Sequence, residues 1–261
     1  MLEFPEISPT IFKLGSLEVR WYGLFYILAF FIGIIFYKKL LPKRDVKLSQ
    51  QNYDNLLFQL MLGVILGGRF GYVLFYNLGY YLHNPLHIFA VWQGGMSFHG
   101  GALGVIIAGL LFCRKNKLNF MQMADPMMPL VSIGLALGRL GNFINAELYG
   151  RVTAVPWAMV FPTDPESLPR HPSQLYEMFL EGILLFFITI FILNKTKRFG
   201  TVFWSWIGFY GLFRFLVEFF RQPDAHLGFV LGFMSMGQVL SLFMVIAGII
   251  GVIFLYRRKN A

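Results

Sequence analysis

Charge is scarce in this sequence. Only 13% of its 261 residues are Asp, Glu, Lys or Arg, whereas 57% are hydrophobic and the mean hydropathy is +0.62. Soluble domains usually carry about a quarter charged residues, so this composition excludes an ordinary soluble domain. It predicts a chain embedded in a bilayer, and the 18% of aromatic residues suits spans with interfacial belts.

Several other features are missing. Cys113 is the single cysteine, so no internal disulfide can form. The first residues, MLEFPEISPT, contain Glu3 and Glu6 and no basic residue, so we expect an uncleaved first span rather than a cleavable signal peptide. The formal charge of +9 does not indicate nucleic-acid binding, because the basic residues form short clusters between apolar runs.

Apolar runs dominate what is present. A helix that crosses a bilayer needs roughly 17–25 such residues. Seven runs qualify, at about 20–37, 53–76, 96–113, 122–143, 174–193, 200–219 and 235–256. We therefore predict an all-α polytopic membrane protein with seven transmembrane helices, forming one domain over residues 1–261. Two longer segments, about 77–95 and 144–173, are expected to form small extracytoplasmic loop or arm elements.

The basic residues predict the orientation. Fourteen of the 22 follow the first, third, fifth and seventh runs: Lys38, Lys39, Lys43, Arg44, Lys47, Arg114, Lys115, Lys117, Lys195, Lys197, Arg198, Arg257, Arg258 and Lys259. With seven spans these clusters share one side, which the positive-inside rule makes cytoplasmic. The N-terminus is then outside and the C-terminus inside, and all five histidines, including His226, lie on the outer half.

Three arginines fall within the predicted spans: Arg69, Arg139 and Arg214. Insertion scales place the penalty for a charge at mid-span at about 2.5–3.5 kcal/mol. Such side chains should therefore face the bundle interior, where they find partners or water. Pairs of glycines spaced four apart, such as Gly63/Gly67 and Gly67/Gly71, indicate close helix packing rather than a site.

A histidine between paired glycines marks the outer start of the third run. The segment from Gly94 to Gly101 reads GGMSFHGG, with His99 near its end. Glycines allow unusual backbone conformations and close approach, and a histidine can act as a general base or hydrogen-bond donor near neutral pH. An interfacial histidine at a turn explains the pattern equally well at this stage.

The segment from Gly138 to Arg151 reads GRLGNFINAELYGR. Arg139 and Asn142 are three residues apart and share a helix face. An arginine fork beside an amide suits a phosphate or carboxylate, and the glycines leave room for it. The alternative is an internal Arg139–Glu147 ion pair that only fixes the end of the helix.

The third pattern is a polar stripe on an apolar helix. Tyr210, Arg214 and Glu218 are spaced four apart, and Arg221 follows three residues later. The alternative is an Arg214–Glu218 pair that merely satisfies itself, since buried pairs are often structural. Because the stripe includes a tyrosine and points to the outer side, we favour a function.

Together these residues predict an anion site at the outer leaflet. Several arginines imply a phosphate, and burial in the bilayer implies that the substrate is a lipid. Tyr22 lies at the same outer level. His83 and His87 lack the carboxylate that would complete a metal set, so no metal site is expected. The residues alone leave the reaction open.

The motifs resemble one family closely. The chain carries HGGALG from His99, GRLGNFINAELYGR from Gly138, HPSQLYE from His171 and YGLFRFLVEFFRQPD from Tyr210, with WYGLFY near Tyr22 and GGRFGYVLFYN near Arg69. These segments are similar to those of the prolipoprotein diacylglyceryl transferases of bacterial inner membranes. The likeness covers nearly the whole chain, except for about 152–170.

The resemblance implies a transferase of lipoprotein biosynthesis. It moves the sn-1,2-diacylglyceryl group of phosphatidylglycerol to the lipobox cysteine thiol in a prolipoprotein signal peptide, forms a thioether and releases glycerol phosphate. It needs neither a cofactor nor a metal. The implied catalytic residues are His99 or Tyr210 as the base, and Arg139 and Arg214 as phosphate stabilisers. The implied substrate-binding residues are Arg139, Asn142, Glu147, Gly150, Tyr22, Glu218 and Arg221.

Two other functions remain open from the residues alone. A transporter or flippase for an anionic lipid or metabolite could use the same arginines without a reaction, although no internal repeat supports it. A scaffold protein could use the ion pairs purely internally. Turnover of phosphatidylglycerol with a lipobox peptide distinguishes the transferase from both.

Overall fold

The computed structural model describes residues 2–15, 17–222, 229–230 and 234–257. His226, Arg258, Lys259 and the end of the fourth motif, Pro223–Asp224, lie outside these residues. The chain forms two compact units. The first comprises Met1–Arg44 and Ala124–Ala261, and the second comprises Asp45–Met123.

Six helical segments are long and apolar enough to cross a membrane: Trp21–Arg44, Gln50–Tyr76, Phe98–Lys115, Phe120–Ile144, Ser173–Lys195 and Met236–Arg257. A seventh apolar helix, α9 (Thr201–Val217), has only 17 residues. The described part of the chain is thus a mostly helical, multi-pass membrane protein, as predicted. The seventh crossing and the orientation stay predictions.

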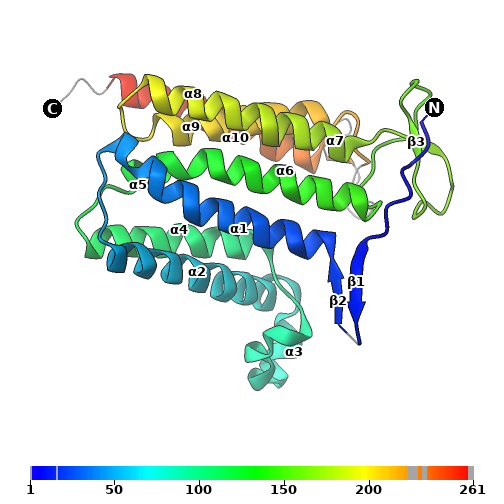
Figure 1. Ribbon diagram of the computed structural model, residues 1–261, viewed down its shortest axis with the longest axis horizontal. Coiled ribbons are helices and arrows are strands. Elements are labelled where there is room, and N and C mark those ends of the chain that lie inside the picture. Colours follow the sequence, from blue (N-terminus) through cyan, green and yellow to red (C-terminus); the bar gives the residue numbers. More distant parts are fainter. Residues whose placement is uncertain (1, 16, 223–228, 231–233, 258–261) are drawn as a thin grey trace. The chain divides into compact units, whose positions relative to one another are not determined.

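In the first unit, helices from distant parts of the sequence lie side by side. α6 (Met128–Ile144) contacts α1 (Trp21–Leu40), and it also contacts α7 (Ser173–Glu177), the π-helical η5 (Met178–Leu184) and α8 (Leu185–Lys195). α9 packs along α10 (Met236–Arg257) (Figure 1). Gly182 of η5 lies so close to Ala136 of α6 that an added Cβ would come within 2.5 Å of the Ala136 side chain. η5 is therefore fixed against α6.

A buried ion pair joins three helix ends in this unit. Arg44, at the end of η1 (Leu41–Arg44), donates to Asp125 of η4 (Asp125–Met127) at 2.8 Å, and both side chains are fully buried. Asp125 also accepts from the backbone N–H groups of Gly200 and Phe203. A carboxylate at these positions satisfies donors that the first turn of α9 leaves without an intrahelical partner.

Three two-stranded sheets accompany the helices. β1 (Thr10–Leu14) and β2 (Leu17–Arg20) form an antiparallel hairpin directly before α1. β3 (Met159–Val160) pairs with β4 (Pro169–Arg170), and β5 (Phe229–Val230) pairs with β6 (Met234–Ser235). These strands were not predicted, because strands of two to five residues are too short to show an alternation of polar and apolar residues.

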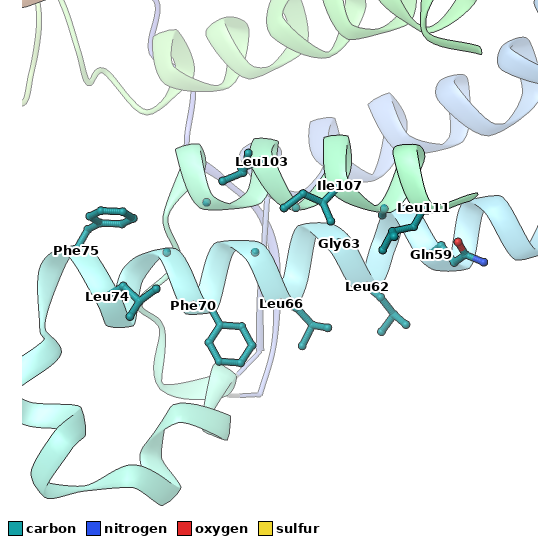
Figure 2. A pocket seen from close by; sticks show the side chains of 15 residues that line it. Gln59, Leu62, Gly63, Leu66, Phe70, Leu74, Phe75, Leu103, Ile107 and Leu111 are labelled. Carbon is teal, nitrogen blue, oxygen red and sulfur yellow. The ribbon is translucent and has the colours of Figure 1, made fainter. Parts of the chain in front are cut away.

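The second unit is built on α2 (Gln50–Tyr76) and α4 (Phe98–Lys115), with α5 (Phe120–Ala124) beginning at its end. Between α2 and α4 lie three short helices: α3 (Leu78–His83), η2 (Pro85–Phe89) and η3 (Val91–Gln93). A Cβ on Gly63 would lie 2.6 Å from the carbonyl oxygen of Gly104, so glycines allow the contact. An apolar groove of about 580 Å³ runs along this helix pair (Figure 2).

Arg69 organises the connection between these two helices. Its buried guanidinium donates to the carbonyls of His87, Ile88, Gly94 and Gly95. An arginine inside a span thus satisfies the backbone of a loop at its end. The prediction that a span arginine finds partners is confirmed for Arg69, whose partners are carbonyl groups. The prediction that Gly63 and Gly67 serve close helix packing is confirmed as well.

Candidate active site

Glu177 is the centre of the polar cluster in the first unit. Glu177 is the last residue of α7, and its fully buried carboxylate contacts three arginines. Arg139 Nε lies 2.7 Å from Oε2, Arg214 Nη1 lies 2.9 Å from the same oxygen, and Arg221 Nη1 lies 3.1 Å from Oε1. One carboxylate therefore fixes arginines from α6, from α9 and from the segment after α9.

Glu218 forms a second, smaller centre. Its Oε1 lies 2.6 Å from Arg214 Nη2, and its Oε2 accepts a 2.7 Å hydrogen bond from Ser235 Oγ. Gly237 packs directly on this carboxyl group, where a Cβ would come within 2.6 Å. The predicted Arg214–Glu218 pair is confirmed, but it belongs to a network with Glu177 and does not satisfy itself alone.

Arg139 keeps most of its hydrogen-bonding capacity. Only its Nε is committed to Glu177, and no other described residue accepts from its two Nη groups. The side chain is 19% exposed, so it is not sealed off from a ligand. A guanidinium held at one nitrogen presents its other two in a fixed fork, which matches a phosphate.

The alternative Arg139–Glu147 ion pair is wrong, because Arg139 pairs with Glu177 instead. Glu147 has different partners: its Oε1 accepts from Asn142 Nδ2 at 2.8 Å and from Asn145 Nδ2 at 3.1 Å. Two amides therefore orient an exposed carboxylate next to the arginine. Asn142 and Glu147, predicted separately as substrate ligands, form one unit.

Tyr22 of α1 lies beside this unit. Its ring packs on Gly141, where a Cβ would lie 2.7 Å from Tyr22 Cδ2, and its hydroxyl is 3.1 Å from that of Tyr26. Its phenol also interacts electrostatically with Glu147 and Arg139. Gly141 thus explains how an aromatic ring can approach the polar end of α6.

Gly150 lies where three backbone segments converge. Its N–H donates to the carbonyl of His171, and it forms a bridge with Arg221. A Cβ here would clash with the backbone of Phe220 and with His171. The nearby Arg151 donates to the carbonyls of Arg221 and Glu218. The structure gives Gly150 a packing role at the edge of the cluster, and its contact with substrate stays a prediction.

Tyr210 lies one turn before Arg214 on α9. Its ring stacks on Trp206, with centroids 5.0 Å apart, and Trp206 Nε1 donates to Ser132 of α6. Its phenol interacts electrostatically with Glu181, Arg214 and Arg139. Tyr210 thus lies on the same helix as Arg214, and its part in the reaction stays a prediction.

His99 lies in the second unit, in the first turn of α4. Ser97 precedes this helix and its Oγ accepts from the N–H of Gly100, which is an N-cap. The imidazole is exposed and in ring contact with Phe98. The prediction that His99 joins the arginines of the first unit stays a prediction.

Two acidic residues of the cluster were missed by sequence reasoning. Glu177 and Glu181 both lie in the fifth span, and both are fully buried. Glu181 Oε1 is 3.7 Å from Arg214 Nη1, yet neither of its oxygens has a hydrogen-bond partner. The sequence did contain a signal for them. Placing two carboxylates in one apolar run is as unfavourable for membrane insertion as placing the arginines that were singled out.

Comparisons with known proteins identify the family. The family model described as "Prolipoprotein diacylglyceryl transferase" matches residues 9–254. Relatives named "Phosphatidylglycerol--prolipoprotein diacylglyceryl transferase" include one from Geobacter sulfurreducens, 54% identical over 99% of both chains. Another from Vibrio atlanticus is 52% identical over 99% of this chain and 94% of its own length. The chain therefore belongs to the prolipoprotein diacylglyceryl transferase family.

Proposed function

We propose that the protein transfers the diacylglyceryl group of phosphatidylglycerol to the lipobox cysteine thiol of prolipoproteins. The observation that carries this proposal is the guanidinium of Arg139. It is held by Glu177 at one nitrogen and keeps its other two for an anion. Family membership supplies the reaction that such an anion site serves.

The chemistry assigns a role to each charged group. A base takes the thiol proton, the thiolate sulfur attacks the glyceryl carbon, and the carbon–oxygen bond to phosphate breaks. Glycerol phosphate leaves with the electron pair of that bond, and the proton passes from the base to it or to solvent. Arg139 binds the phosphate, and Arg214 stabilises the charge that it gains. Glu218 holds Arg214 in this scheme, because the two form an ion pair. Arg221, which pairs with Glu177 and Glu218, is assigned to substrate binding.

A thiol has an ordinary pKa of about 8.5, so it needs a base or a positive field to react quickly. His99 and Tyr210 are the two proposed bases. Tyr210 is supported by its place four residues before Arg214 on α9, whereas His99 is supported by its exposed imidazole and the glycines that flank it in sequence. Single alanine variants of each, compared by their pH–rate profiles, distinguish the two.

The head group is assigned to the outer end of α6. Asn142 and Glu147 form a hydrogen-bonded unit next to Arg139, and Tyr22 packs beside them. An ionised carboxylate only accepts hydrogen bonds, so Glu147 suits the hydroxyls of the glycerol head group rather than its phosphate. Gly150 keeps the neighbouring backbone close.

The proposed setting is the bacterial inner membrane, with the site on its outer side. Seven spans put fourteen of the 22 basic residues on the cytoplasmic side, the N-terminus outside and the C-terminus inside. The partners are then the bilayer, phosphatidylglycerol and a signal peptide anchored in the same membrane. No nucleic acid takes part.

The test uses purified protein, phosphatidylglycerol vesicles and a peptide with a lipobox cysteine. Mass spectrometry should show the diacylglyceryl group on the cysteine, and a peptide with serine at that position should stay unmodified. Absence of product under every lipid condition would overturn the proposal. Near-normal turnover in both His99→Ala and Arg139→Ala would overturn the assignment of roles.

A further inference from the structure

The turn that carries Glu147 has an unusual backbone. Ala146 and Leu148, the residues on either side of it, both have positive φ angles, +54° and +58°. Residues with a Cβ seldom adopt this left-handed region, and such strain persists only where the surroundings enforce it. The question is what enforces it here.

Three side chains hold the turn. The consecutive carbonyl oxygens of Ala146, Glu147 and Leu148 accept hydrogen bonds from Thr163 Oγ1, from Gln174 Nε2 at 2.7 Å and from Ser173 Oγ at 3.2 Å. Ser173 and Gln174 are fully buried at the start of α7. We call these three residues the carbonyl clamp.

The clamp determines where the Glu147 carboxylate lies. With the backbone fixed, Asn142 and Asn145 both donate to Oε1, and no described residue donates to Oε2. The carboxylate therefore presents one free acceptor oxygen from a preset position. Such an acceptor recognises hydroxyl donors and repels phosphate.

We propose that Gln174, with Ser173 and Thr163, is a positioning residue that sets selectivity for a polyol head group. It acts through Glu147 and does not touch the lipid itself. This inference rests on the proposed function, because it assigns the hydroxyls of phosphatidylglycerol to Glu147. It adds that selectivity depends on residues outside the contact surface.

The main variant is Gln174→Met, which keeps the length of the side chain and removes the donor. Kinetics with a lipobox peptide give the KM for phosphatidylglycerol, and inhibition by phosphatidic acid, which lacks the glycerol head group, gives a Ki. We expect the KM to rise about tenfold, as for loss of one well-placed hydrogen bond. The Ki should change less than twofold.

Matched variants separate positioning from folding. Gln50→Met makes the same change at an exposed site at the start of α2 and should alter neither constant. Ser173→Ala is a milder change to the clamp and should shift the same ratio in the same direction. Leu148→Gly removes the strain and leaves the clamp donors in place, so both the stability of the folded protein and its selectivity should be kept.

A ratio of KM to Ki that Gln174→Met leaves unchanged would overturn the proposal. If the unmodified protein shows no transfer, the proposed function fails first. The role of the clamp in selectivity can then be tested by binding alone. The ratio of the dissociation constants of phosphatidylglycerol and phosphatidic acid is measured on the purified protein and needs no turnover. A ratio that Gln174→Met leaves unaltered overturns the clamp in that case too.

Discussion

Arg139 shows how one residue can be both anchored and available. Its Nε lies 2.7 Å from Glu177 Oε2, and the side chain is 19% exposed. Lysine keeps the charge but cannot be held at one nitrogen while offering two others.

We therefore expect Arg139→Lys to lower kcat/KM by about ten- to a hundredfold, the equivalent of one charged hydrogen bond. The measurement is transfer to a lipobox peptide at several phosphatidylglycerol concentrations. Arg20→Lys, at a side chain that is 60% exposed, is the control and should leave the rate unchanged. Equal rates for the two variants would mean that only a point charge is needed.

Glu177 and Glu181 make a second contrast between single residues. Glu177 binds three arginines, whereas both oxygens of Glu181 are buried without a hydrogen bond. Removing a charge that has little compensation should stabilise a fold, and removing a paired one should destabilise it.

Glu181→Gln should therefore raise the thermal midpoint, with a gain of about 1 kcal/mol in unfolding free energy. Glu177→Gln should lower the midpoint, because it leaves buried arginines with a weaker partner. Thermal unfolding in detergent measures both. A lower midpoint for Glu181→Gln would show that its carboxylate has a structural partner.

At the scale of elements, the helix pair α2 and α4 depends on glycine contacts. A methyl group on Gly63 would lie 2.6 Å from the carbonyl oxygen of Gly104, and that backbone cannot move aside locally. We expect Gly63→Ala to destabilise the protein by about 1–3 kcal/mol, as for overpacking. Gly33→Ala in α1 meets nothing within 4 Å and should leave the midpoint unchanged or higher. Thermal unfolding of both variants checks this, and equal midpoints would contradict it.

The segment between α6 and α7 contains its own ion pair. Arg170 donates to both oxygens of Asp164, and this guanidinium holds the pKa of the Asp164 carboxyl below its ordinary value of 3.8. A lowered pKa in the folded state means that the unfolded chain binds the proton more readily. The contribution of the pair is therefore complete above about pH 4 and is lost as the pH falls further.

As the pH is lowered below about 4, we expect the thermal midpoint of the unmodified protein to decrease more steeply than that of Asp164→Asn. The asparagine variant should be less stable at pH 7, and the two midpoints should approach each other in acid. Parallel curves across this range would show that Asp164 does not contribute through its charge.

The sequence predicted the helices better than the site. All seven apolar runs became helices with ends within a few residues of expectation, because long apolar stretches need no tertiary information. The partner of Arg139 could not be predicted in this way. Glu147 is eight residues away from Arg139 and Glu177 is 38 residues away, and only the packing of α7 on α6 selects Glu177. The left-handed turn at Ala146 and Leu148 had no signal either, since neither residue is glycine.

For the whole molecule, the topology depends on the predicted seventh crossing by α9. Its 17 residues are fewer than those of each of the six helical segments that are long enough to cross a membrane. In the predicted topology with an outside N-terminus, seven crossings leave the C-terminus inside, whereas six leave it outside.

Single cysteines at Lys13, Lys47 and Ala261, in a Cys113→Ala background, test this. A membrane-impermeant maleimide should label Lys13→Cys in intact spheroplasts, and Lys47→Cys and Ala261→Cys only after lysis. Labelling of Ala261→Cys in intact spheroplasts would contradict the seventh crossing. Equal labelling of Lys13→Cys and Lys47→Cys before lysis would instead reveal leaky spheroplasts.

The arrangement around Glu177 also has a consequence for how the protein is made. Arg139 leaves the ribosome before Glu177, whereas Arg214 and Arg221 follow it. A nascent chain that has inserted its fifth span can neutralise Glu177 with Arg139 alone, and the two later arginines complete the cluster when α9 arrives. Assembly of the arginine cluster thus waits for the last fifth of synthesis, so we expect a chain that ends before α9 to show no transfer.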